Sequence, residues 1–169
     1  MRSVGAALIL LASLALGLGF AREKKRRLTA LRELCAALEL LAAELEARGE
    51  PLPRICERLG GCAPGGAGAF FRRVSESLPF LGERSFSALW TESLEQSYLF
   101  LKPQERQELQ QLGSLLGRYE LSRQLAGIRR CQALLELERD SAQAGTAQEQ
   151  KLGIGLSLAA GLLLTLALF

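Results

Sequence analysis

The two ends of the chain restrict its fold most, because each is a long run of residues without a single charge. Residues 3–21 read SVGAALILLASLALGLGFA, and residues 152–169 read LGIGLSLAAGLLLTLALF. A helix of 18 residues rises about 27 Å, close to the thickness of the apolar core of a bilayer. We therefore predict a membrane-spanning helix at each end. A cleaved signal peptide is the alternative for the first run and a buried core helix for the second, but the first is long and ends directly in the basic REKKRR.

Basic residues beside the two runs predict how the chain is oriented. Besides Arg2, they are Arg22, Lys24, Lys25, Arg26, Arg27 and Lys151. By the positive-inside rule, residues 22–151 are expected in the cytoplasm, with both termini on the other side of the membrane. The basic flank at 22–27 could also touch anionic lipid headgroups, although a topology signal is the simpler interpretation.

The middle of the chain has a different charge balance from the whole. The total charge is +3, but seven of the 21 basic residues lie beside the ends, and Glu23 lies among them. The stretch 28–150 therefore holds 14 basic and 17 acidic residues. This composition reveals no basic face for a nucleic acid, so we expect no nucleic-acid partner.

Histidine is absent from the chain, which removes the usual general base and the usual metal ligand. The four cysteines, Cys35, Cys56, Cys62 and Cys131, form no C-x-x-C pair, and their spacing does not favour a zinc site. Reduced thiols are the default in a cytoplasm. We expect no enzyme activity and no catalytic, cofactor-binding or metal-binding residues.

The middle reads as a series of helices, so we predict an all-α cytoplasmic bundle of five to six helices over 28–150. Leucines at helical spacing follow residues 28–48, and Gly49 ends that helix. Shorter helices are predicted around Leu52–Leu59 and over 70–78. The segment 60–68, GGCAPGGAG, is predicted to be a loop. It resembles a phosphate cradle, but neither a preceding strand nor a following Lys-Ser/Thr supports a P-loop.

Three further helices are predicted in the second half. Ser85 is expected to cap a helix that runs to Leu101, Pro103 to open the next, and Glu120 to open a last long helix. The apolar faces expected to point inward are Phe86, Leu89, Trp90, Leu94, Tyr98 and Leu101 on the first, Leu109, Leu112, Leu115 and Leu116 on the second, and Leu121, Leu125, Ile128, Cys131 and Leu135 on the third. The polar tail DSAQAGTAQEQK, 140–151, is Gly-weakened, and its conformation is left open.

Gly113 and Gly117 have G-x-x-x-G spacing, but charged residues follow them at once, so they are not a lipid-embedded pair. Gly117 is typical of a helix stop. Gly113, one turn earlier, lowers helix stability by about 1 kcal/mol relative to alanine, which suggests that a neighbouring helix approaches closely there. We predict a tight helix–turn–helix corner in the bundle.

The order of these motifs resembles the stage III sporulation protein AB family. The resemblance runs through the first span, its basic flank, PLPRICERLG and Ala88-Leu89-Trp90, and is strongest over residues 101–117. The family's corner, L-G-x-x-L-G-x-S-D-x-x-x-Q-x-x-x-I, is matched by Leu112, Gly113, Leu116, Gly117, Gln124 and Ile128. Tyr119 and Glu120 stand where Ser and Asp are usual, and Lys102 replaces a frequent Thr or Ser, which puts the helix caps in doubt and not the corner.

This resemblance implies a function that composition does not. The family's soluble domain is similar to that of the type II secretion platform protein F. The family acts in endospore formation, in a complex that links mother cell and forespore, from the mother-cell membrane. The expected partners are a stage III sporulation ATPase of the same operon and other membrane components of the channel complex. The exposed faces of 85–101 and 103–117 and the 60–68 segment are the docking candidates.

Three other interpretations stay open. A small membrane hydrolase would have to recruit Lys or Glu as its base. A general type II secretion or pilus-like platform outside sporulation normally has two homologous domains and three spans, whereas this chain shows one domain and two predicted spans. A secreted helical protein would require cleavage of the first apolar run.

Overall fold

The computed structural model describes the backbone of residues 2–48 and 50–168, and the side chains of 22–47 and 50–144. Within these backbone ranges the chain forms six α-helices, one 3-10 turn and no β-sheet. The elements are α1 (Arg2–Arg48), α2 (Leu52–Cys62), α3 (Gly65–Ser77), η1 (Leu78–Phe80), α4 (Phe86–Glu95), α5 (Pro103–Leu115) and α6 (Leu121–Leu168). The predicted all-helical class is therefore confirmed.

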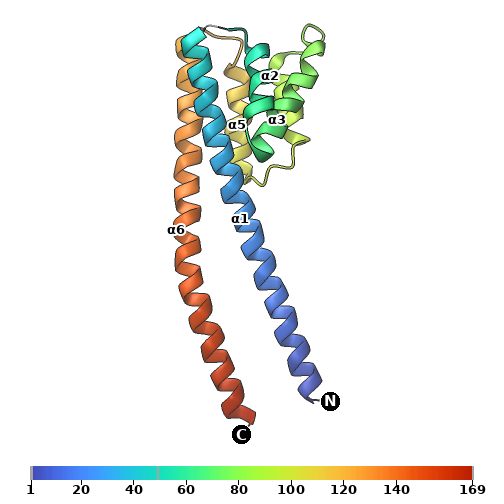
Figure 1. Ribbon diagram of the computed structural model, residues 1–169, viewed down its shortest axis with the longest axis vertical. Coiled ribbons are helices and arrows are strands. Elements are labelled where there is room, and N and C mark those ends of the chain that lie inside the picture. The colour runs from blue at the N-terminus through green and yellow to red at the C-terminus, as the bar shows by residue number, and fades with distance from the viewer. Residues whose placement is uncertain (1, 49, 169) are drawn as a thin grey trace.

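Two long helices carry the bundle of shorter ones. The antiparallel helices α1 and α6 lie side by side, and the shorter helices gather against the C-terminal half of α1 (Figure 1). Both long helices continue out of the bundle at one end, which we call the base. The 96–102 linker lies at the base, and the turn at 116–120 lies at the opposite, distal end.

The predicted leucine stripe of α1 forms the centre of the core. Its five members are all buried: Leu31, Leu34, Leu38, Leu41 and Leu45. The aromatic centre lies between α3 and α4, where Trp90 packs edge-on against Phe70 at 4.8 Å and Phe71 at 5.8 Å between ring centroids. These contacts explain why the short helices α3 and α4, which are too short to be stable alone, form here.

The prediction of a loop over 60–68 was wrong, because α2 runs to Cys62 and α3 begins at Gly65. The glycines serve close packing instead. A Cβ on Gly60 would lie 2.9 Å from Arg72 Cα, and one on Gly65, whose φ is +57°, would overlap the Glu33 carboxylate at 2.1 Å. Glu33 accepts a hydrogen bond from the Gly66 N–H at 2.8 Å. A carboxylate of the protein thus occupies the N-terminus of α3, where a phosphate would have to bind.

The predicted helix from Ser85 begins as expected but ends early. The Ser85 hydroxyl accepts from the Ala88 N–H at 3.2 Å, yet α4 stops at Glu95. Tyr98, predicted to face inward, is 91% exposed, and Leu99 is buried in its place. The prediction failed because hydroxyl and carbonyl groups end the helix: Ser97 donates to the Leu94 carbonyl, and the chain then runs extended to Pro103.

The last helix differs from its prediction at one position. Ile128, Cys131 and Leu135 are buried as expected, whereas Leu121 is 43% exposed. Leu121 is the first residue of α6 and lies at the distal end, beyond the reach of the core.

The long helices continue without a break through the predicted domain boundaries. The basic flank 22–27 belongs to α1, and the tail 140–150 belongs to α6. Within the residues whose side chains the structure describes, no helix has an apolar stretch long enough to cross a bilayer. The spans predicted at 3–21 and 152–169 lie outside these residues.

Candidate functional site

The described cysteines and carboxylates were the candidates for covalent or metal chemistry. Burial is the largest effect on three thiols, raising the pKa of Cys35 to about 11 and those of Cys56 and Cys131 to about 12, so they stay protonated. Cys62 is exposed, and all four cysteines are free of disulfides. Within residues 22–47 and 50–144, no group of three or more cysteine or carboxylate side chains is placed to hold a metal ion.

The glycines of the predicted corner have separate tasks. A Cβ on Gly113 would lie 2.2 Å from Trp90 Cδ1, so the indole occupies the space that a side chain would need. The Trp90 Nε1–H donates to the Leu109 carbonyl at 2.7 Å, which fixes the ring against α5. Gly117 follows the end of α5 with φ +73°, a conformation that glycine adopts without strain.

A glutamine closes the corner. The Gln124 Oε1 accepts from the Gly117 N–H at 3.1 Å, and its Nε2 donates to the Tyr119 carbonyl at 2.6 Å. The remaining predicted corner residues, Leu112, Leu116 and Ile128, are buried beneath it. Where Ser and Asp are usual, Tyr119 lies under the Arg123 guanidinium at 4.2 Å. The structure therefore brings all six predicted corner residues together at the distal end.

Sequence reasoning missed a charged cluster at the base, which we call the charged joint: Arg27, Lys102, Glu105 and Glu138. The Arg27 Nε donates to Glu105 Oε1 at 3.0 Å, and its Nη2 contacts Glu105 and also donates to Glu138 at 2.6 Å. The Lys102 backbone N–H donates to Glu105 Oε2 at 2.6 Å, and its ammonium lies 3.3 Å from Glu138. These bonds tie α1, the start of α5 and α6 together.

The joint adds to the sequence analysis, which considered Arg27 only as part of the basic flank. The Glu105 side chain, at the start of α5, is 0% exposed. Burial lowers the pKa of Arg27, but the two carboxylates outweigh it and raise that pKa overall. For Glu138, burial acts to raise the pKa of the carboxyl. The neighbouring charges of Lys102 and Arg27 outweigh burial, so the pKa of Glu138 is lowered overall. The available signal was Glu105, three residues after Lys102, the N-cap of α5.

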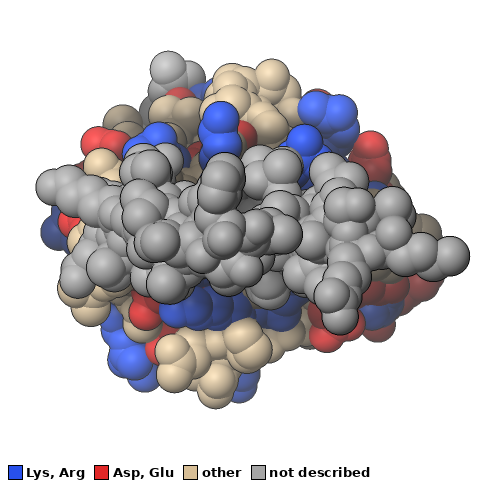
Figure 2. Space-filling model, turned by 90° about the horizontal axis from the view of Figure 1, so that it is seen from below, with Lys and Arg blue, Asp and Glu red and all other residues tan. Residues whose placement is uncertain are grey.

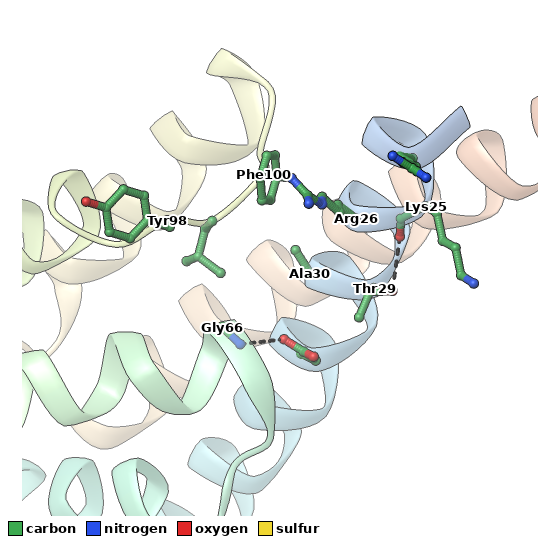
Figure 3. A pocket seen from close by; sticks show the side chains of 10 residues that line it. Lys25, Arg26, Thr29, Ala30, Gly66, Tyr98 and Phe100 are labelled. Carbon is green, nitrogen blue, oxygen red and sulfur yellow. Dashed lines mark hydrogen bonds between the residues drawn. The ribbon is translucent and has the colours of Figure 1, made fainter. Parts of the chain in front are cut away.

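Four other predicted topology residues, Arg22, Lys24, Lys25 and Arg26, are exposed on α1 near the base, where Figure 2 shows basic side chains. The side chain of Lys151 lies outside the described residues. A hollow of about 420 Å³ is lined by Arg22, Lys25 and Arg26 on α1 and by the 98–100 linker (Figure 3).

A second hollow lies at the distal end. Its volume is about 430 Å³, and it borders the corner at Gly117 and Gln124. Two leucines on its rim are unusually exposed, Leu81 at 47% and Leu121 at 43%. We call this hollow and its rim the distal groove. Apolar rims of this kind are typical of protein-interaction surfaces.

The sequence model of the stage III sporulation protein AB family matches residues 2–169. This chain belongs to that family. It is 29% identical to the stage III sporulation protein AB of Bacillus subtilis (strain 168), with 99% of each chain covered. A solved structure of a stage III sporulation protein AB is similar to it at 26% identity and a TM-score of 0.66, covering 73% of this chain and 98% of that one. The family is one of sporulation proteins and not a known enzyme family.

Proposed function

We propose that this chain is a non-enzymatic platform in the mother-cell membrane around the forespore, and that it docks the stage III sporulation ATPase of the same operon onto the channel complex. Family membership supports the role in sporulation. The uncharged runs at both ends support anchoring in the membrane. Membership in a sporulation family also disfavours the alternative of a general secretion or pilus-like platform.

The charged joint is the observation that carries the mechanical part of this proposal. It links the start of α5 to α1 and α6 at the level where those helices leave the bundle. At its other end, α5 leads into the corner and the distal groove. A push on the distal end would therefore pass along α5 to both long helices, since packed helices move as rigid bodies rather than deforming.

Two surfaces suit the expected partners. The distal groove, farthest from the base, is the proposed seat of the ATPase. The outer face of α6 carries Leu137, which is 68% exposed, and is the proposed contact for other membrane components. The docking candidates suggested by sequence, 85–101, 103–117 and 60–68, reach the distal groove at Phe86 and Gly117 but do not include Leu81, Leu121 or Leu137.

Co-purification from sporulating cells tests the docking. The ATPase serves as bait, and the full chain is solubilised in detergent after mild crosslinking. We expect the wild-type chain and a Leu137→Glu variant to be captured, and a Leu81→Glu/Leu121→Glu variant to be lost. The wild type and both variants must show the same thermal midpoint, so that folding is not the cause. Failure to capture even the wild type would contradict ATPase docking and leave a structural role among the membrane components.

A further inference from the structure

The linker between α4 and α5 exposes two aromatic rings at the base. Tyr98 is 91% exposed and Phe100 is 42% exposed, although a folded bundle gains nothing from leaving such rings in water. Both flank the hollow beside α1, and Figure 3 shows the Arg26 side chain directed at the Phe100 ring. The guanidinium carbon of Arg26 lies 5.2 Å from the centre of that ring, within the range of a cation–π contact.

Basic residues line the opposite wall of the same hollow. Lys25 and Arg26 follow Arg22 by three and four residues, so both share a face of α1 with Arg22. Within residues 22–47 and 50–144, none of these three side chains forms an ion pair. We call Arg22, Lys25, Arg26, Tyr98 and Phe100 the basal surface.

The one carboxylate in this hollow does not neutralise the basal surface. Glu33 accepts a hydrogen bond from the Gly66 N–H at 2.8 Å. Its charge is therefore directed at the start of α3, two turns from Arg26 along α1. On the other side of the linker, the Arg27 charge is already balanced by Glu105 and Glu138. An incoming anion would meet uncompensated positive charge beside exposed aromatic rings.

We propose that the basal surface binds the headgroups of anionic phospholipids and seats the bundle on the membrane. This inference rests on the membrane anchoring in the proposed function. If the first span ends at residue 21, Arg22 to Arg26 lie within about 8 Å of its end along α1, which is the depth of the headgroup layer. Basic residues beside anionic lipids and a tyrosine at the interface are the pattern expected at that depth.

The second predicted span would place the membrane boundary farther from the bundle than the first one does. Lys151 lies about 20 Å below Glu138 along α6, because a helix rises about 1.5 Å per residue. If that span alone set the membrane boundary, Tyr98 would stay in water. A reporter at position 98 separates the two geometries.

The experiment uses the full chain in lipid nanodiscs. Nanodiscs have no fixed inner and outer side, so removing basic residues that also direct topology in the cell does not affect the result. A Tyr98→Trp substitution at this exposed position provides the reporter, and the parent chain, whose single Trp90 is buried, gives the background. Nanodiscs contain equal phosphatidylglycerol and phosphatidylcholine, with bromine on the acyl chains of one lipid or the other. The ratio of the two quenching efficiencies measures the lipid preference at position 98.

We expect the indole introduced by Tyr98→Trp to be quenched more by the brominated phosphatidylglycerol. Adding Arg22→Gln, Lys25→Gln and Arg26→Gln to the reporter chain should abolish this preference and bring the quenching ratio close to one. Each basic residue near an anionic surface contributes about fivefold to the attraction, so the three together contribute roughly 100-fold. The matched control replaces three arginines of the distal half, Arg54, Arg118 and Arg129, with glutamine and should retain the preference.

Three results would overturn the inference. The first is that neither brominated lipid quenches the introduced indole, and the second is that both quench it equally. The third is that the distal control variant loses the preference for phosphatidylglycerol as strongly as the basal variant does. A chain that fails to enter nanodiscs at all would contradict membrane anchoring itself, and would thereby be distinguished from a chain that enters but shows no lipid preference.

Discussion

The contact between Gly113 and Trp90 predicts a large effect from adding a single methyl group. In Gly113→Ala, the new Cβ would lie 2.2 Å from Trp90 Cδ1, well inside any real carbon–carbon contact. The indole must therefore retreat by more than an ångström. It cannot do so freely, because it is fully buried between two phenylalanine rings and donates to the Leu109 carbonyl.

The size of the effect follows from three contributions. Overpacking a core costs about 1–3 kcal/mol, and leaving the indole N–H without its partner costs about 1–3 kcal/mol. Alanine returns about 1 kcal/mol through its higher helix propensity. We expect the free energy of unfolding to fall by about 1–5 kcal/mol, and a fall in the middle of this range lowers the midpoint by roughly 10 °C in a bundle of this size.

Thermal unfolding of the full chain in detergent measures this directly. Trp90 is the only tryptophan, so its fluorescence and near-ultraviolet circular dichroism report on the site itself. Gly61→Ala is the matched control: the same methyl group meets nothing within 4 Å in α2 and should raise stability by about 0.5 kcal/mol. A Gly113→Ala midpoint equal to or above the wild-type value would refute the argument.

Three other predictions concern the charges and thiols. Glu105→Gln leaves Arg27 partly unpaired and should lower the free energy of unfolding in denaturant by about 2–4 kcal/mol, whereas the exposed Glu120→Gln should change it by less than about 0.5 kcal/mol; equal effects would argue against the joint. Lys102 and Arg27 together outweigh burial and lower the pKa of Glu138 in the folded chain. The contribution of Glu138 to folding stability is therefore present above the ordinary value of 4.5 and is lost as the pH falls through the folded pKa. Glu138→Gln should flatten the acid side of a profile of stability against pH. Alkylation of the native chain at neutral pH should add one label, at Cys62, and unfolding should admit three more; rapid labelling of several thiols in the native chain would contradict the buried placement.

The helical class and much of the core could be predicted from sequence, because leucine spacing and terminal glycines are local signals. The α1 stripe and the α5 stop at Gly117 depend only on residues near them in the chain. Gly113 was also informative, since a glycine inside a helix is unfavourable unless something requires its missing side chain. That the Trp90 indole fills this space depends on tertiary packing, so it could be seen only in the structure.

The charged joint and the glycine-rich segment could not be predicted for the same physical reason. Arg27 and Glu105 are separated by 78 positions in the chain, and composition treats both as ordinary surface charges. The glycines of 60–68 suggested a loop, because glycine is favoured in turns, but here they let helices and the Glu33 carboxylate approach the backbone. Tyr98 fitted a helical period, and only the end of α4 at Glu95 placed it in solvent.

Site-specific photocrosslinking in sporulating cells would show which partner contacts each of the three proposed surfaces. A photoreactive phenylalanine would replace Leu121 in the distal groove, Leu137 on α6 or Tyr98 at the base, one position at a time. We expect the ATPase to be crosslinked from position 121, other membrane components from position 137, and lipid to be labelled from position 98. Crosslinking of the ATPase from position 98 but not from 121 would contradict the proposed arrangement, in which the base faces the membrane and the distal groove carries the ATPase.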